Sequence, residues 1–178
     1  MKETMLVTGG CRSGKSAYAL GAAEKMDASQ RYFLATCEPA DDEMRARVDR
    51  HKQERGDHWR TLECPVKIAA AITDIQDSEA VVLVDCLTLW MSNLLATSED
   101  QAELERWIAG LSRAVARAAA SVILVSNEVG CGIVPENRLA RLYRDMVGLA
   151  NQRLAESVDR VVWMVSGMPV TVKEGPAS

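Results

Sequence analysis

Long apolar runs, closely paired cysteines and an excess of positive charge are all missing from this 178-residue sequence. No apolar run approaches the roughly 20 residues that a membrane-spanning helix needs, so we expect no membrane span. The five cysteines are odd in number and none forms a C-x-x-C pair, which argues against a disulfide or zinc framework and predicts reduced thiols in the cytoplasm. A net charge of −4 and a pI near 5.3 argue against a nucleic-acid partner held by bulk electrostatics.

Short apolar segments alternate with helical segments along the chain. The apolar segments are rich in β-branched or aromatic residues and do not alternate with polar ones, which is typical of strands buried on both faces of a parallel sheet. We predict strands at 5–8, 32–36, 81–85, 122–126 and 161–165, and helices at 15–26, 41–55, 66–75, 87–95, 99–119 and 135–157, with Pro135 opening the last helix. This order predicts a single domain over residues 1–178 with a doubly wound α/β fold, a mostly parallel sheet, and ligands at the carboxyl ends of the strands.

The segment G-G-C-R-S-G-K-S matches the P-loop pattern G-x-x-x-x-G-K-[ST] at every fixed position, between a predicted strand and a predicted helix. Its glycines let backbone N–H groups point at phosphate oxygens, and the helix N-terminus adds a favourable dipole. We expect Lys15 to reach the β- and γ-phosphates and the hydroxyl of Ser16 to hold Mg²⁺. The predicted nucleotide-binding residues are Gly9, Gly10, Cys11, Arg12, Ser13, Gly14, Lys15 and Ser16.

The apolar run V-V-L-V followed by Asp85 resembles a Walker B strand, whose terminal acid holds the Mg²⁺ of a bound nucleotide. The same pattern also occurs in buried strands that end in a polar turn. Beside a P-loop we favour the metal-binding interpretation of Asp85.

The chain has only two histidines, His51 and His58. On the predicted helix 41–55, His51 lies one turn from both Arg47 and Arg55, so the three side chains share a face. A neutral imidazole between two guanidinium groups can attack a phosphorus atom while the cations hold its oxygens, and neighbouring positive charge favours the neutral form. A helix of mixed charge is more often only a solvated face, so the residues alone leave the role of His51 open.

Several segments in order resemble one family, namely G-G-C-R-S-G-K-S, D-D-E-M-R-A-R-V-D-R-H-K, H-W-R-T-L-E, S-N-E-V-G-C-G-I-V-P-E-N-R-L-A-R and N-Q-R-L-A. They resemble the bifunctional adenosylcobinamide kinase / adenosylcobinamide-phosphate guanylyltransferase of cobalamin biosynthesis. The resemblance runs from about residue 5 to residue 173. It implies a RecA-like P-loop fold and a homo-oligomer, typically a trimer.

The resemblance also implies a chemistry. A nucleoside triphosphate, ATP or GTP, phosphorylates adenosylcobinamide, and GMP is then transferred from GTP to adenosylcobinamide phosphate through a guanylylated histidine. The family often has two adjacent histidines there, and here the pair is Arg50 and His51, so the second, the nucleophile, is kept. By matched position the resemblance adds these residues to the nucleotide site: Thr36, Cys37, Glu38, Lys52, Gln53, Glu54, Arg55, Glu63 and Asp85.

Two other functions compete with the bifunctional enzyme. A simple small-molecule kinase would use the P-loop and need no histidine, and a GTP-binding regulatory protein would bind nucleotide without forming a corrinoid product.

The corrinoid site is not visible as a motif, and Trp59 and Trp90 are candidates either for such a site or for the core. The glycine-rich block 127–135 predicts either a loop that approaches a ligand or a turn that caps the next helix.

Overall fold

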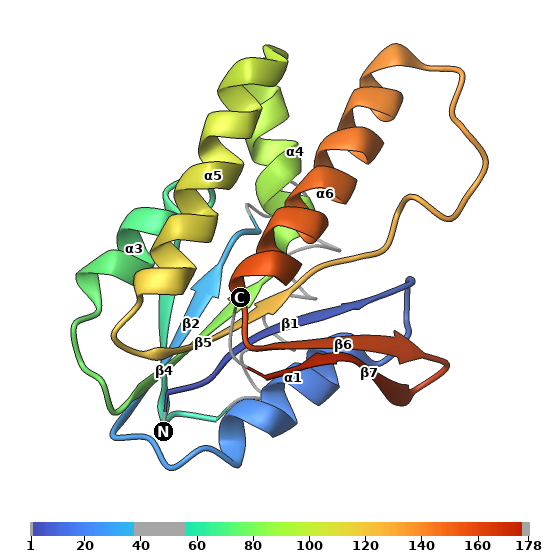
Figure 1. The fold of residues 1–178 in the computed structure, drawn as a ribbon. Coiled ribbons are helices and arrows are strands. Elements are labelled where there is room, and N and C mark those ends of the chain that lie inside the picture. Colours follow the sequence, from blue (N-terminus) through green and yellow to red (C-terminus); the bar gives the residue numbers. More distant parts are fainter. Residues whose placement is uncertain (1, 38–55, 176–178) are drawn as a thin grey trace.

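The computed structural model describes residues 2–37 and 56–175 (Figure 1). Within them, seven strands form one sheet in the order β3-β2-β4-β5-β1-β6-β7, and all neighbours are parallel except β6 and β7. The strands are β1 (Thr4–Gly9), β2 (Gln30–Ala35), β3 (Trp59–Glu63), β4 (Ala80–Asp85), β5 (Ser121–Val125), β6 (Arg160–Val165) and β7 (Met168–Glu174). The helices are α1 (Lys15–Glu24), α3 (Ile68–Asp74), α4 (Leu87–Thr97), α5 (Gln101–Arg117) and α6 (Arg138–Ser157). The predicted helix at 41–55 lies outside the described residues.

Alternate side chains of the central strands enter two separate cores. On β4, Val82 and Val84 pack with residues of α3, α4, α5 and α6, whereas Val81 and Leu83 pack with residues of α1. Figure 1 shows those four helices on one face of the sheet and α1 on the other. Burial on both faces explains why these strands are uninterrupted apolar runs, and the predicted doubly wound fold is confirmed.

The two edge strands escape the sequence pattern. β3 exposes Arg60, Leu62 and Glu63, and nearly all of β7 is exposed, including Pro169. An edge strand pairs on one side only and tolerates proline and polar residues. A search for buried apolar runs therefore detects the five inner strands and misses the two outer ones.

The predicted start of the last helix is wrong by three residues. α6 begins at Arg138 because Asn137 is its N-cap, with Oδ1 accepting the N–H of Ala140 at 3.0 Å. Pro135 therefore precedes the helix instead of opening it. Arg141 holds this approach segment by donating to the carbonyl oxygens of Pro135 and Glu136 at 3.1 and 2.6 Å.

None of the helices described is both long and apolar enough to cross a membrane.

Candidate nucleotide-binding site

The P-loop segment turns sharply between the end of β1 and the start of α1. Gly14, the N-cap of α1, has φ 90°, and Arg12 has φ 54°, so two residues of the loop adopt left-handed backbone conformations. The N–H of Ser13 donates to the carbonyl of Gly10 at 3.3 Å. Right- and left-handed residues in succession turn neighbouring N–H groups toward one concave side, which is how backbone forms an anion-binding nest.

Lys15 is a buried cation with no acid paired to it in the part of the chain that the structure describes. The residue is only 9% exposed, and its Nζ donates to the carbonyl oxygen of Gly10 at 3.0 Å. No carboxylate in the described ranges forms an ion pair with it. Within residues 2–37 and 56–175, the buried hydroxyl of Ser13 likewise has no hydrogen-bond partner. A buried charge is costly unless it is paired, so this loop has the donors and the positive charge that fit a phosphate group.

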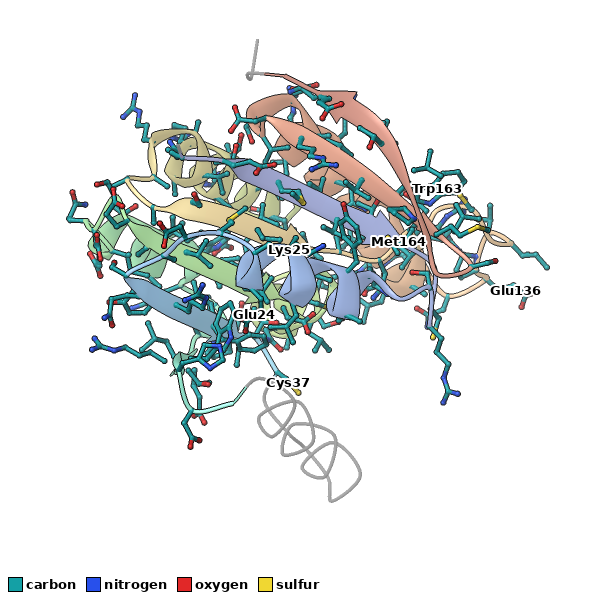
Figure 2. The ribbon with its side chains drawn as sticks, turned by 90° about the horizontal axis from the view of Figure 1, so that it is seen from below. Glu24, Lys25, Cys37, Glu136, Trp163 and Met164 are labelled. Carbon is teal, nitrogen blue, oxygen red and sulfur yellow. The ribbon has the colours of Figure 1, made fainter. Side chains whose placement is uncertain are left out.

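The carboxyl ends of neighbouring strands enclose the P-loop. Glu128, just beyond β5, donates its N–H to the carbonyl of Gly9 at 3.0 Å. Gly167, in the turn from β6 to β7, donates its N–H to the carbonyl of Ser13 at 3.1 Å. Seen from below, α1 lies across the sheet in front of these strands, with Glu24 and Lys25 at its far end (Figure 2). The loop is thus held on both sides and followed by a helix packed on the sheet.

Asp85 is the last residue of β4 and is half-buried. Strand β5 separates β4 from β1. Asp85 therefore lies two strands away from the P-loop strand, and Asp85 and the P-loop both lie at the carboxyl ends of the strands. Burial, together with the nearby charge of Asp85, raises the pKa of the Cys86 thiol. This partly desolvated carboxylate suits a role toward a cation.

The residues predicted to hold Mg²⁺ fit that ion chemically. Ser16 and Asp85 offer a hydroxyl and a carboxylate oxygen, which are the hard ligands that Mg²⁺ prefers. The described residues contain no group of three or more His, Cys, Asp or Glu side chains able to hold a metal by themselves. Mg²⁺ sites in nucleotide-binding enzymes usually have few protein ligands and are completed by nucleotide phosphates and water.

A second set of predicted residues lies at the other side of the sheet. Thr36 and Cys37 follow β2, and the exposed Glu63 ends β3 at the sheet edge. Three strands, β2, β4 and β5, separate β3 from the P-loop strand. The structure therefore places these residues away from Gly9–Ser16, and Thr36 is fully buried. The remaining predictions, His51, Glu38, Lys52, Gln53, Glu54 and Arg55, lie outside the described residues.

The structure adds polar residues that the sequence left undecided. Asn127, two residues beyond β5, donates from Nδ2 to Oγ1 of Thr88 at 2.9 Å, and that hydroxyl lies 2.8 Å from the sulfur of Cys86. The carbonyl of Asn127 accepts from Asn151 of α6 at 3.1 Å. The available signal was a polar residue at the end of a predicted buried strand. Through these bonds Asn127 links the end of β5 to α4 and α6. Trp59 and Trp90, 7% and 1% exposed, belong to the core.

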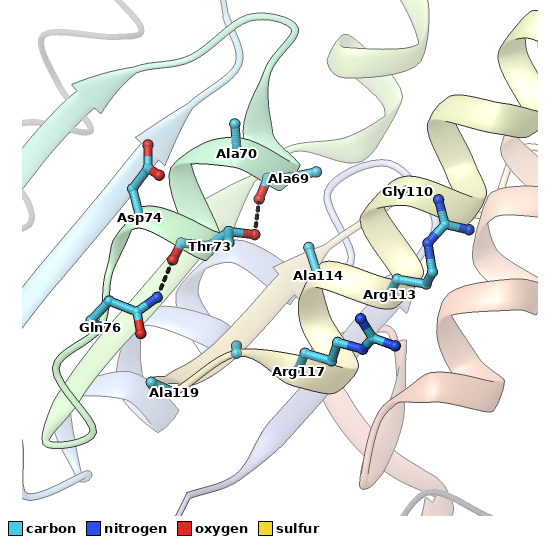
Figure 3. Close-up of a pocket in the computed structure, with 11 residues that line it drawn as sticks. Ala69, Ala70, Thr73, Asp74, Gln76, Gly110, Arg113, Ala114, Arg117 and Ala119 are labelled. Carbon is cyan, nitrogen blue, oxygen red and sulfur yellow. Dashed lines mark hydrogen bonds between the residues drawn. The ribbon is translucent and has the colours of Figure 1, made fainter.

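A separate pocket of about 430 Å³ lies between α3 and α5 (Figure 3). Five alanines line it together with polar residues such as Thr73, Gln76, Arg113 and Arg117, and the Thr73 hydroxyl is already bonded to the carbonyl of Ala69. α5 leads into the start of β5, so the pocket lies toward the amino ends of the strands, away from the P-loop. None of the predicted site residues that the structure describes lines it.

The fold and the P-loop define a P-loop nucleotide-binding protein with a RecA-like sheet. Solved structures with this fold include a Pyrococcus horikoshii OT3 protein, PH0250 (TM-score 0.57, 11% identity, 99% of this chain and 91% of that chain). Another solved structure with this fold is an ATPase domain (TM-score 0.55, 12% identity, 99% of this chain and 79% of that chain). At these identities the likeness shows the fold alone.

Residues 5–172 match the family model "Cobinamide kinase / cobinamide phosphate guanyltransferase", and the chain belongs to this family. It is 44% identical to the bifunctional adenosylcobalamin biosynthesis protein CobU of Salmonella typhimurium, over 95% of this chain and 99% of that protein. It is 39% identical to the bifunctional adenosylcobalamin biosynthesis protein CobP of Pseudomonas aeruginosa, over 96% and 98%. The resemblance predicted from the sequence motifs is confirmed.

Proposed function

We propose that this chain is a transferase of cobalamin biosynthesis that acts twice on a corrinoid. In the first reaction the γ-phosphoryl group of ATP or GTP is transferred to the hydroxyl of adenosylcobinamide. In the second, GMP is transferred from GTP to adenosylcobinamide phosphate, giving adenosylcobinamide-GDP and pyrophosphate. Family membership supports this pair of reactions over a simple kinase or a GTP-binding regulator.

The observation that carries the nucleotide part of the proposal is the buried ammonium group of Lys15, which pairs with no acid among the residues described. It lies in a turn where Arg12 and Gly14 have left-handed backbone conformations, and the buried Ser13 hydroxyl beside it has no hydrogen-bond partner among the described residues. Residues Gly9–Ser16 would hold the β- and γ-phosphates there. Ser16 and Asp85 would hold Mg²⁺, which when bound neutralises charge on the phosphate oxygens.

We propose His51 as the nucleophile of the second reaction. A ring nitrogen attacks the α-phosphorus of GTP, a P–N bond forms, and the bond to the bridging oxygen breaks to release pyrophosphate. A phosphate oxygen of adenosylcobinamide phosphate then attacks the same phosphorus and frees the histidine. Glu38, Lys52, Gln53, Glu54, Arg55, Glu63 and Cys37 belong to the same nucleotide site in this proposal. Thr36, which is fully buried, contributes to that site through the backbone of Cys86 and not by contact with the nucleotide.

Labelling tests the covalent step directly. Protein incubated with GTP labelled at the α-phosphate and then denatured should carry an adduct that is labile in acid and stable in base. His51→Ala should lose the adduct, whereas His58→Ala, which removes the only other histidine, should keep it. Label that persists in His51→Ala would exclude His51 as the nucleophile. His51→Ala should still phosphorylate adenosylcobinamide, because the first reaction needs no histidine.

We further propose a cytoplasmic homo-oligomer, a trimer as the family resemblance implies. Size-exclusion chromatography with light scattering measures the mass of the particle. A mass three times that of the 19.5 kDa chain is expected, and a monomer would contradict the trimer.

A further inference from the structure

A single buried hydroxyl fixes the turn that carries Asp85. Thr36 lies just beyond β2, is fully buried, and bonds both backbone groups of Cys86 through Oγ1. That oxygen accepts the N–H of Cys86 at 2.8 Å and donates to the carbonyl of Cys86 at 2.8 Å. Strands β2 and β4 are neighbours, so two residues 50 positions apart in the sequence form this reciprocal pair.

Cys86 is the junction between the end of β4 and α4. It follows Asp85 directly and is the N-cap residue of α4, and its carbonyl also accepts the N–H of Trp90 at 3.1 Å. The N–H of Thr36 donates to the carbonyl of Asp85 at 3.3 Å, which continues the ladder between the strands. The carbonyl of Asp85 and both backbone groups of Cys86 are thereby held by Thr36, the residue just beyond the neighbouring strand.

Thr36 is itself anchored from the helix layer. Asn93 of α4 donates from Nδ2 to the carbonyl of Thr36 at 2.8 Å and to the carbonyl of Pro65 at 2.9 Å. The hydroxyl therefore has little freedom to move, and neither does the turn that it holds. Because Thr36 is fully buried, its side chain acts through Cys86 and not by contact with a ligand.

We infer that Thr36 is a positioning residue, whose hydroxyl sets the direction of the Asp85 carboxylate toward a nucleotide-bound divalent cation. The inference rests on the proposed function, in which Asp85 meets that cation. Groups that orient metal-binding residues typically change metal affinity by about 10- to 100-fold when they are lost. Thr36→Val removes the hydroxyl and keeps the shape of the side chain, whereas Thr36→Ser keeps the hydroxyl.

The chain contains a matched control at the amino ends of the strands, opposite to the end that carries Asp85. Thr4, 3% exposed, donates from Oγ1 to Oδ2 of Asp159 at 2.7 Å and accepts the N–H of Asp159 at 2.9 Å. Thr4 lies at the start of β1 and Asp159 just before β6, away from the P-loop end. Thr4→Val therefore removes a comparable buried pair of hydrogen bonds without touching the turn at Asp85.

The test measures GTP binding by calorimetry across a Mg²⁺ titration and in EDTA, without a corrinoid acceptor, alongside thermal unfolding. In Thr36→Val, the Mg²⁺ concentration that gives half of the full increase in GTP affinity should rise about tenfold. The GTP affinity measured in EDTA should not change. Thr36→Ser, which keeps the hydroxyl, should respond to Mg²⁺ as the wild type does. In an Asp85→Asn background, Thr36→Val should add no further loss.

Three results would overturn the inference. One is an equal loss of affinity with and without Mg²⁺, and another is a Mg²⁺ response in Thr36→Val that matches Thr4→Val at similar stability. The third is full additivity with Asp85→Asn, because residues that act through one another are not additive. Failure of the wild-type protein to bind GTP at all would instead contradict the proposed function, so the two failures are distinguishable.

Discussion

Trp59 donates its indole N–H to Oε1 of Glu24 at 2.7 Å, and Nε2 of His58 lies 2.8 Å from the same oxygen. Glu24 is the last residue of α1, the helix that follows the P-loop, and Trp59 begins β3. Arg31 of β2 completes the cluster at 3.6 Å from Oε2. One carboxylate thus ties the helix of the nucleotide site to the edge of the sheet.

This cluster predicts an acid-sensitive contribution to stability. Burial raises the pKa of Glu24, but hydrogen bonds from Trp59 and His58, with the charges of His58 and Arg31, together lower the pKa below its ordinary value of 4.5. A carboxyl whose pKa is lower in the folded state stabilises the protein above its unfolded pKa, and that stability is lost as the pH falls through the folded pKa. The free energy of unfolding should therefore fall below about pH 4.5 more steeply in the wild type than in Glu24→Gln.

Urea unfolding from neutral pH into this acidic range measures the difference. Glu156→Gln is the control, since Glu156 is exposed on α6 and its carboxylate pairs, among the described residues, with Arg153 alone, at 3.6 Å. Its curve should run parallel to that of the wild type. Parallel curves for Glu24→Gln and the wild type would show that the cluster contributes no pH-dependent stability.

The predictable part of the fold is the part buried on both faces. The inner strands carry uninterrupted apolar runs because α1 covers one face and α3 to α6 the other, and that pattern is readable without coordinates. β3 and β7 obey different constraints, since edge strands need one hydrogen-bonded neighbour and little apolar surface. Their sequences, W-R-T-L-E and M-P-V-T-V-K-E, carry no signal of the kind that identified the others.

The same distinction applies to the site. Gly9–Ser16 could be predicted because a P-loop is formed by consecutive residues, so its spacing is visible in the sequence. The hydrogen bonds between Thr36 and Cys86 could not be predicted, because they depend on β2 lying beside β4 and join residues 50 positions apart. Thr36 entered the prediction through resemblance, as part of a nucleotide site, and only the structure gives its hydroxyl a partner.

Two adjacent glycines of the P-loop should respond very differently to alanine. A Cβ at Gly9 would lie 2.6 Å from Oγ of Ser13 and 2.7 Å from the carbonyl oxygen of Met164, which is backbone of β6 and cannot easily move. A Cβ at Gly10 would meet nothing within 4 Å. Gly9→Ala should therefore lower the free energy of unfolding by about 2 kcal/mol, as overpacked sites do, and weaken GTP binding.

Gly10→Ala is the control for that substitution and should stay within about 1 kcal/mol of the wild type. Urea unfolding and nucleotide titration of both variants give the comparison. Equal damage from the two substitutions would mean that glycine matters here for backbone freedom in general and not for the close approach of β6.

The exposed thiol of Cys11 offers a footprint of the nucleotide. Cys11 lies within the P-loop and Cys131 in the loop before α6, and both are exposed. Cys86 should react slowly with an alkylating reagent, because burial and the charge of Asp85 raise its thiol pKa and thiolate is the reactive form. GTP with Mg²⁺ should slow alkylation of Cys11 and leave that of Cys131 unchanged, as mass spectrometry of peptides would measure. Equal rates at Cys11 with and without GTP would place the nucleotide elsewhere.

Lys15 and Lys173 should separate nucleotide binding from stability. Lys15→Met removes a buried cation that has no acid partner among the described residues, so stability without nucleotide should hold or rise. GTP affinity should fall about 10- to 100-fold, the equivalent of one or two charge-assisted hydrogen bonds.

Lys173→Met should do the reverse. Its Nζ donates to the carbonyls of Ala155, Glu156 and Val158 at 3.1, 3.1 and 2.7 Å, where the end of α6 also favours positive charge. Losing these bonds should lower the free energy of unfolding by about 1–2 kcal/mol and leave GTP affinity unchanged. Thermal unfolding and calorimetry of the two variants measure both quantities. If Lys15→Met binds GTP as tightly as the wild type does, the proposed nucleotide site loses its main support. The buried cation would then serve packing and would not bind a phosphate.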